Sequence, residues 1–313
     1  MTEHAAMPMV VDTDVGTDDA VALVLALRDP GAEVVAVTAV AGNTTLPNVI
    51  QNALYTIELC GARVPVHAGS SRPLLRQLAT AAEVHGGDGL GDIGLPLHGR
   101  SPAATPAVEA LIQAAREHAG RLVLVTLAPL TNIALACLAD PQFASNVGRC
   151  VVMGGTGRGP GNVTPVAEFN IWVDPEAAAI VFESGLPLTM VGWDACEADA
   201  TFSEAELDEL RARDTALARF CVDIQRVSRD RARAAGRSEG ICIPDPLAMA
   251  VALDSTLIAE ARRLPVAIET RGSLTSGQTV VDHLGVTGAT ASAEVVFRAD
   301  RGRFMAMVQR ALA

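Results

Sequence analysis

The chain has 313 residues; half are hydrophobic and only 3% are aromatic, so its core would be built mainly from Ala, Val, Leu and Ile. A formal net charge of −12 argues against DNA, RNA or another polyanion as a partner. Every basic side chain other than histidine is an arginine. The missing lysine excludes a Schiff base, a pyridoxal-phosphate linkage and a P-loop.

The cysteines and the apolar runs also limit the possible functions. The six cysteines are scattered without a Cys-x-x-Cys pair, so we interpret them as free structural thiols rather than zinc or redox ligands. No basic stretch followed by an apolar one opens the chain, and no run of about 18 apolar residues appears later. We therefore expect a cytoplasmic protein with no membrane partner.

Short apolar runs alternate with helical stretches along the chain, which is typical of a mostly parallel sheet covered on both faces. The expected strands are residues 9–11, 33–40, 64–67, 122–127, 150–153, 188–191, 266–268, 279–281 and 293–297. The expected helices are residues 18–28, 47–59, 108–119, 130–138, 246–253, one beginning at 175 and one at the carboxyl end. These elements predict a single α/β domain over residues 1–313, an open, Rossmann-like sheet with helices on both faces. A mostly helical segment at about 203–240 would cover the site.

Two long loops interrupt this pattern, at residues 69–106 and 154–174. The first contains His85 followed by five glycines between positions 86 and 94. Long irregular segments in a compact domain are uncommon unless they serve a site. We therefore expect both loops to border the functional site.

Four carboxylates follow the first predicted strand within eight residues: Asp12, Asp14, Asp18 and Asp19. Ligands of open α/β sheets bind beyond the carboxyl ends of the strands, so the position suits a site. Helix capping is the structural alternative for Asp18, but it does not explain the other three. Carboxylates this close repel one another unless a cation or proton lies among them. The cluster therefore predicts a hard, oxygen-seeking ion such as Ca²⁺ or Mg²⁺.

A second polar group lies in the loop at 161–170, with Asn162, Glu168 and Asn170. Two amides and a carboxylate can hold several hydroxyls at once, as a sugar requires; the structural alternative is a polar loop with Asx turns. The alternating glycines from 155 to 161 imitate a dinucleotide-binding motif. Pro160 and Pro165 stand where its helix should begin, so we reject that motif.

Taken in order, several segments resemble one known family. Residues 11–20, VDTDVGTDDA, are similar to the signature of the inosine-uridine nucleoside hydrolases, with Val15 where that family ordinarily has proline. Further matching segments are residues 40–45, 128–134, 152–155, 167–170, 174–177 and 245–248, with 279–282 a weaker echo. Each segment alone is weak, but their order and spacing from about residue 11 to 250 make the set specific.

The resemblance implies a calcium site and a ribose site. Calcium would be held by Asp14, Asp19, the backbone carbonyl of Leu127 and Asp245. The ribose would be held by Asp18, Asn43, Asn162, Glu168 and Asn170, with Met153 packing nearby. Asp12 would support the site from behind, and Asp14 would also be the general base that takes a proton from the attacking water.

The sequence departs from the family on the side of the leaving base. Many members carry a histidine immediately before the last calcium ligand, where this chain has Pro244, which cannot donate a proton. His85 matches a family histidine near the base and is the leading substitute; a structural role is its alternative. The arginines between 226 and 237 lie where the family contacts the base, although a solvated charged face is the favoured reading. Trp193, where an aliphatic residue is usual, would line the pocket or fill the core.

We therefore predict calcium-dependent hydrolysis of the N-glycosidic bond of ribonucleosides to ribose and free base, a reaction of nucleoside catabolism and of purine or pyrimidine salvage. The base preference stays open, and the family implies a homodimer or homotetramer. One alternative is a nucleoside- or ribose-binding protein that lost turnover with the change to Pro244. Another is a haloacid-dehalogenase-type phosphatase, because Asp12-x-Asp14 resembles its nucleophile motif, but it leaves Asn43 and Glu168 unexplained.

Overall fold

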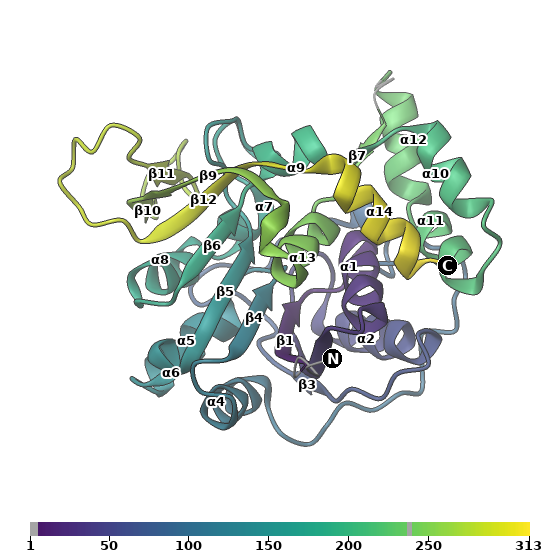
Figure 1. Ribbon diagram of the computed structural model, residues 1–313, viewed down its shortest axis with the longest axis horizontal. Helices are drawn as coiled ribbons and strands as arrows, with labels where there is room; N and C mark the ends of the chain where they lie inside the picture. Colours follow the sequence, from purple (N-terminus) through teal and green to yellow (C-terminus); the bar gives the residue numbers. More distant parts are fainter. Residues whose placement is uncertain (1–5, 237–239) are drawn as a thin grey trace, which may run out of the picture.

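The computed structural model describes residues 6–236 and 240–313 and is built around one eight-stranded sheet (Figure 1). The strand order is β3-β2-β1-β4-β5-β6-β12-β9, with every neighbouring pair parallel except β12 and β9. The strands are β1 (Met7–Thr13), β2 (Ala32–Ala39), β3 (Val66–Ala68), β4 (Leu122–Thr126), β5 (Val147–Met153), β6 (Leu188–Val191), β9 (Ile258–Leu264) and β12 (Ala293–Ala299). The predicted open, mostly parallel sheet is confirmed.

The central strands are apolar on both sides because each side faces a separate core. In β1, Met9 and Val11 belong to one hydrophobic cluster, whereas Val10 between them belongs to the other. Side chains alternate across a strand, so a sheet buried on both faces needs a nearly continuous apolar run. This is why short apolar runs located the central strands from the sequence.

Helices form the two outer layers, on either side of the sheet (Figure 1). One layer contains α1 (Thr17–Arg28), α2 (Leu46–Leu59), α13 (Asp245–Leu253) and α14 (Arg301–Ala311). The other contains α4 (Ala107–Glu117), α5 (Thr131–Ala139), α6 (Phe143–Asn146) and α8 (Pro175–Glu183). Helices on both faces were predicted and are confirmed.

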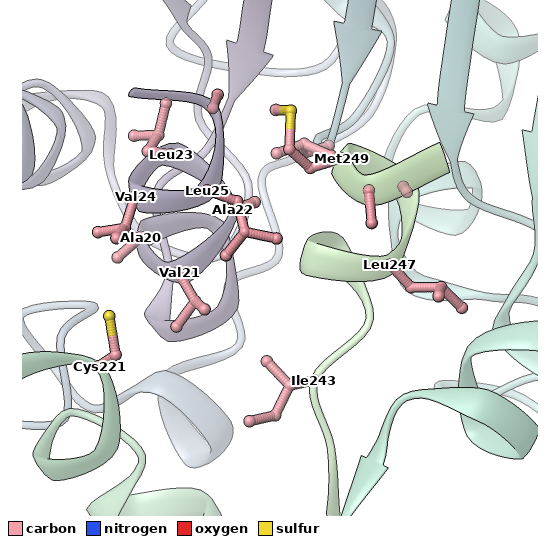
Figure 2. Packing of buried hydrophobic residues seen from close by; sticks show 14 of the residues in the cluster. Ala20, Val21, Ala22, Leu23, Val24, Leu25, Cys221, Ile243, Leu247 and Met249 are labelled. Carbon is pink, nitrogen blue, oxygen red and sulfur yellow. The ribbon is translucent and has the colours of Figure 1, made fainter. Parts of the chain in front are cut away.

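Helix α1 runs through the centre of its layer and packs beside α13 (Figure 2). Every residue of α1 from Thr17 to Ala26 is buried, and a helix that is apolar on all sides belongs in such a position. Both helices begin with acidic residues, and these are brought together: Asp18, Asp19 and Asp245 form one group. The packing of two apolar helices therefore places three carboxylates side by side.

A mostly helical segment follows β6. It consists of α9 (Trp193–Asp199), β7 (Thr201–Phe202), α10 (Glu204–Arg211), α11 (Ala216–Asp223), α12 (Arg226–Ala234) and β8 (Ile241–Cys242). Within it, α12 packs against the short helix α3 (Ala82–His85) of the first long loop. Arg237, part of the predicted arginine-rich stretch, lies outside the described residues.

Residues 266–292 form an arm at the edge of the sheet, with β10 (Val266–Ile268) and β11 (Thr279–Val281) at its base (Figure 1, yellow-green). The arm exposes four large hydrophobic side chains: Leu274, Val280, Leu284 and Val286. In the part of the chain that the structure describes, no helix is long and apolar enough to cross a membrane.

Candidate metal and sugar site

The site lies where β1, β4 and β5 end and where α1 and α13 begin. Asp18, Asp19 and Asp245 each offer a carboxylate oxygen, and these oxygens lie within 4.8 Å of one another. All three residues are buried, and Asp14 is fully buried beside them. Among the described residues, this is the group of acidic side chains whose geometry suits a metal ion.

Electrostatics support a cation at this point. Burial raises the pKa of Asp14 and of Asp245 well above the usual range, and the neighbouring carboxylates raise both further. Burial likewise raises the pKa of Asp18 to about 6, and its Oδ1 atom has no hydrogen-bond partner among the described residues. A crowded, buried group of this kind is stabilised by a positive charge. Because all the donors are oxygens, the residues fit Ca²⁺ or Mg²⁺.

The carboxylates are held in place by short hydrogen bonds. Asp19 accepts from the Thr13 hydroxyl at 2.5 Å and from the Gly16 N–H at 2.8 Å. Asp14 accepts from the Asn43 N–H at 2.6 Å, and the Asn43 side-chain amide donates to both Asp14 and Asp19. Here Asn43, predicted to grip the ribose, bridges two predicted calcium ligands. It therefore lies directly at the acidic group.

The loop after β2 must approach Asp14 closely. A Cβ atom at Gly42 would lie 2.0 Å from Asp14 Oδ2, so this position tolerates only glycine without a shift of the carboxylate. The constraint ties β2 to β1 at the end of the sheet where the site lies.

The predicted carbonyl ligand, Leu127, directly follows β4. Its oxygen accepts a hydrogen bond from the Asn170 amide at 2.9 Å, and the same amide donates to the Met153 carbonyl at 3.2 Å. The Met153 sulfur is 3.5 Å from that nitrogen. The structure thus brings Leu127, Met153 and Asn170 together, with Asn170 joining the ends of two strands.

Glu168 and Asn170 lie at the start of α7 (Phe169–Val173), a helix that was expected to be loop. The Glu168 carboxylate caps this helix by accepting from the Asn170 and Ile171 N–H groups, and it also accepts from Gly155. Burial raises its pKa to about 7, to which the nearby Asp18 contributes. Asn162 is exposed and accepts from the Phe169 N–H at 2.9 Å, so it lies at the outer side of this loop.

Asp12 lies behind the acidic group, on the other side of β1. Its Oδ1 atom accepts from Thr38 at 2.6 Å and from the Asn132 amide at 2.8 Å, while its backbone carbonyl accepts from the Leu127 N–H. Burial raises its pKa to about 7. These bonds match the supporting role implied by the resemblance, and they reveal Thr38 and Asn132 as partners that the sequence did not identify.

His85 ends α3 and is buried beside Asp18, with 3.7 Å between Nδ1 and Asp18 Oδ1. Burial lowers its pKa to about 4, against the opposing influence of Asp19 and Glu83. The ring is therefore neutral at pH 7. The long glycine-rich loop does reach the acidic group, as expected.

The residues on the base side have structural contacts. Pro244 precedes α13, and its carbonyl oxygen lies 3.8 Å from the Cys196 sulfur. Trp193 begins α9 and is partly buried against the core, and its backbone N–H donates to the Gly155 carbonyl. Hence Pro244 supplies no proton donor, and Trp193 contributes to packing.

The arginines of α12 bind the protein itself. Arg226 donates to the carbonyls of Gly91 and Asp92, and Arg229 pairs with Glu204 and Asp208. Arg233 pairs with Glu204 and Asp230, while Arg231 lies 4.0 Å from Glu83. The predicted solvated face is therefore an ion-paired surface that joins α12 to α10 and to the first long loop.

Comparisons with known proteins agree with this geometry. A profile described as "Inosine-uridine preferring nucleoside hydrolase" matches residues 9–306. The pyrimidine-specific ribonucleoside hydrolase RihA of Shewanella woodyi is 39% identical over 308 residues, covering 97% of each chain. The Salmonella schwarzengrund protein of the same name is 36% identical over 313 residues, covering 98% of each chain.

Two solved structures share the fold over nearly the whole chain. The plant nucleoside hydrolase PpNRh1 has a TM-score of 0.93 and 31% identity, covering 98% of this chain and 99% of that one. The purine-preferring ribonucleoside hydrolase of Gardnerella vaginalis has a TM-score of 0.90 and 30% identity, covering 97% and 98%. These matches leave the phosphatase alternative without support. The chain belongs to the inosine-uridine preferring nucleoside hydrolase family.

Proposed function

We propose that this protein is a calcium-dependent ribonucleoside hydrolase that releases ribose and free base. The observation that carries the proposal is the buried acidic group near Asn43, Glu168 and Asn170. In it, one Asp18 oxygen has no hydrogen-bond partner among residues 6–236 and 240–313. Asp14, Asp19, Asp245 and the Leu127 carbonyl would hold the ion. Ca²⁺, when bound, would lower the pKa of water and orient the ribose diol.

The protein groups divide the remaining work. Asp14 would act as the general base, because its buried carboxylate lies in the acidic group that would hold the ion and the attacking water. Cleavage of the N-glycosidic bond develops positive charge on the sugar, and the buried Asp18 and Glu168 carboxylates would stabilise it. Asn43, Asn162 and Asn170 would bind the hydroxyls, with Met153 packing nearby.

Protonation of the leaving base is the step for which the family's usual residue is missing, because Pro244 offers no donor. His85 is the remaining catalytic candidate, and its neutral ring can donate one hydrogen bond to the departing base. A nucleoside- or ribose-binding protein with impaired turnover is the second candidate function, and Pro244 is the observation that favours it.

The test is a panel of purine and pyrimidine ribonucleosides scored by ribose release, in chelator-treated buffer with Ca²⁺ or Mg²⁺ added back. We expect turnover that depends on Ca²⁺. Tight binding without ribose release, even in single-turnover reactions, would support the binding protein instead. The panel would also fix the base preference.

We also propose a homodimer or homotetramer. The four hydrophobic side chains exposed on the arm support a contact between copies, because monomeric proteins rarely expose such groups together. Light scattering should show more than one chain per particle, and Leu284→Asp combined with Val286→Asp should reduce that number. A cytoplasmic location stays a prediction, to be tested by cell fractionation. That residues 203–240 cover the site also stays a prediction, and the contact between α12 and α3 supports it.

A further inference from the structure

One ring nitrogen of His85 is held by the first turn of α1. Nδ1 lies 3.1 Å from the Thr17 backbone nitrogen, which donates to it, and 3.0 Å from the Thr17 hydroxyl oxygen. A backbone N–H can only donate, so Nδ1 must accept. In the neutral ring the proton then lies on the other nitrogen, Nε2.

Nε2 is the nitrogen that remains free for a ligand. Among the described residues it has no hydrogen-bond partner, and it is not one of the buried polar atoms sealed from solvent. The Thr17 contact therefore orients the ring so that its single donor is available.

Thr17 is itself fixed from a distant part of the chain. Its carbonyl accepts a hydrogen bond from Gln225 Nε2 at 2.9 Å, and both side chains are buried. Gln225 lies between α11 and α12, 208 positions after Thr17 in the chain. The same amide nitrogen also donates, at a longer 3.4 Å, to the Cys221 carbonyl within its own segment. The shorter bond to Thr17 is a buried contact between distant segments rather than a surface one.

Helix α12 also holds the backbone on either side of His85. The Ser228 hydroxyl donates to the Val84 carbonyl at 3.0 Å, and Arg226 donates to the carbonyls of Gly91 and Asp92. The Gly91 N–H in turn donates to the His85 carbonyl at 2.8 Å. The ring and its peptide are thus fixed by α1 and α12 together.

We propose that Thr17 and Gln225 are positioning residues that hold His85 as the Nε2–H tautomer, the form that donates a hydrogen bond to the leaving base. This inference rests on the proposed function, because it assigns His85 to the departing base of a nucleoside. The proposal explains how the leaving base could receive a hydrogen bond although position 244 is a proline. The neutral ring of His85, fixed by the Thr17 backbone N–H, would offer its Nε2–H to the base.

The direct test reads the tautomer without any turnover. Nitrogen-15 NMR of the full-length protein with labelled histidine distinguishes a protonated from an unprotonated ring nitrogen, and His85→Gln identifies the signal. We expect Nδ1 unprotonated and Nε2 protonated at neutral pH. A proton on Nδ1 would overturn the proposal, whether or not the protein hydrolyses nucleosides. Conversely, the expected tautomer in a protein without hydrolase activity would defeat the proposed function and leave the positioning intact.

A matched pair of variants tests the backbone donor. Thr17→Pro removes the N–H at the first position of α1, where helices accept proline, and Gly16 before it is already extended. Thr17→Ala removes only the hydroxyl and should keep the tautomer signal. We expect Thr17→Pro to lower kcat for uridine by about 10²-fold, the low end for general acid–base assistance, and to change turnover of p-nitrophenyl riboside little. An equal loss on both substrates would assign Thr17 to structure alone.

Gln225→Met provides a second test if the Thr17→Pro variant does not fold. It keeps the volume of the side chain but removes the donor to Thr17. We expect the ratio of uridine to p-nitrophenyl riboside turnover to fall by about 10-fold. An unchanged ratio would remove Gln225 from the proposal.

Discussion

Two parts of the site are built differently. We call the group of Asp14, Asp18, Asp19, Asp245 and the Leu127 carbonyl the floor, and the region of His85 and Pro244 the base side. On the floor, Asp14, Asp19 and Leu127 lie at the ends of central strands or the start of a buried helix, and each is fixed by hydrogen bonds of 2.5 to 2.9 Å. On the base side, His85 lies on a four-residue helix in a long loop, and Pro244 offers no donor. In the proposed function, rigid elements would hold most of the metal ligands, whereas a long loop would supply the residue that acts on the leaving group.

Breaking the floor should have the largest effect. Asp245→Asn removes one negative charge from the group that would hold the ion, and we expect kcat/KM for ribonucleosides to fall by about 10⁴-fold. Calcium binding measured by calorimetry should be lost as well. The matched control is Asp254→Asn, the same change at the opposite end of α13 on an exposed ion pair. Wild-type turnover of Asp245→Asn in chelator-treated buffer would contradict the metal assignment.

The floor can also be tested from the substrate side. Asp18 and the ion should both contact the ribose diol, so 2′-deoxyuridine would leave buried polar groups unpaired. We expect its kcat/KM to be about 10³-fold below that of uridine, less than the full effect of a hydroxyl-reading site because the 3′-hydroxyl remains. A change on the base alone, as in 5-methyluridine, should matter far less. Equal values for uridine and 2′-deoxyuridine would contradict the role of the sugar-binding residues.

On the base side we expect a substitution to cause a smaller loss of turnover, whose size depends on the substrate. Burial lowers the pKa of His85 to about 4, so its ring is neutral at pH 7. In the proposed function this neutral ring would donate a hydrogen bond to the leaving base. His85→Ala should slow natural nucleosides by about 10²-fold, at the low end of general acid catalysis. The rate on p-nitrophenyl riboside, whose leaving group needs little protonation, should change little. A loss of the same size on both substrates would move His85 from the base to binding or folding.

The smallest expected effect is a shift in melting temperature. Burial raises the pKa of Asp12 and Glu168 to about 7 and of Asp18 to about 6, so the folded protein binds protons that the unfolded chain has lost above pH 4. Their contribution to stability is therefore greatest at low pH and is lost as the pH rises to about 7. The pKa values of the proposed ligands Asp14, Asp19 and Asp245 are raised in the same way, and a bound cation would replace their protons. The stabilisation by Ca²⁺ should therefore grow from pH 5 to pH 8. A calcium-induced shift in Tm that is the same at both pH values would contradict this picture.

The elements around the floor could be predicted from the sequence because local patterns encode them. Cores on both faces of the sheet explain the apolar runs of the central strands, and Asp14, Asp18 and Asp19 follow the end of β1. Elements whose structure depends on distant partners were missed. The edge strand β9 carries charged residues and has no apolar run, and α7 is a short helix begun by Glu168.

The base side could not be predicted for a similar reason. Gln225 and Thr17 meet only because α11, which ends just before Gln225, packs against α1, and no local pattern marks either residue. The arginines of α12 also read as a solvated face, since their partners Gly91 and Glu204 lie far away in the sequence. Local periodicity reports burial, whereas such pairs are set by tertiary packing.

The arm joins the outer surface to the loop that carries Glu168. Gln278 forms a bridge to Ala167, the Thr279 hydroxyl bonds to Thr156 in both directions, and the His283 ring lies 2.8 Å from the Gly157 carbonyl. In the proposed oligomer, a neighbouring copy bound to the arm would steady this loop and would be thermodynamically linked to the substrate. By reciprocity, a nucleoside that tightens the loop would strengthen that proposed contact by the same factor. Dilution of such an oligomer would then weaken its affinity for substrate, and saturation with substrate would oppose its dissociation into single chains.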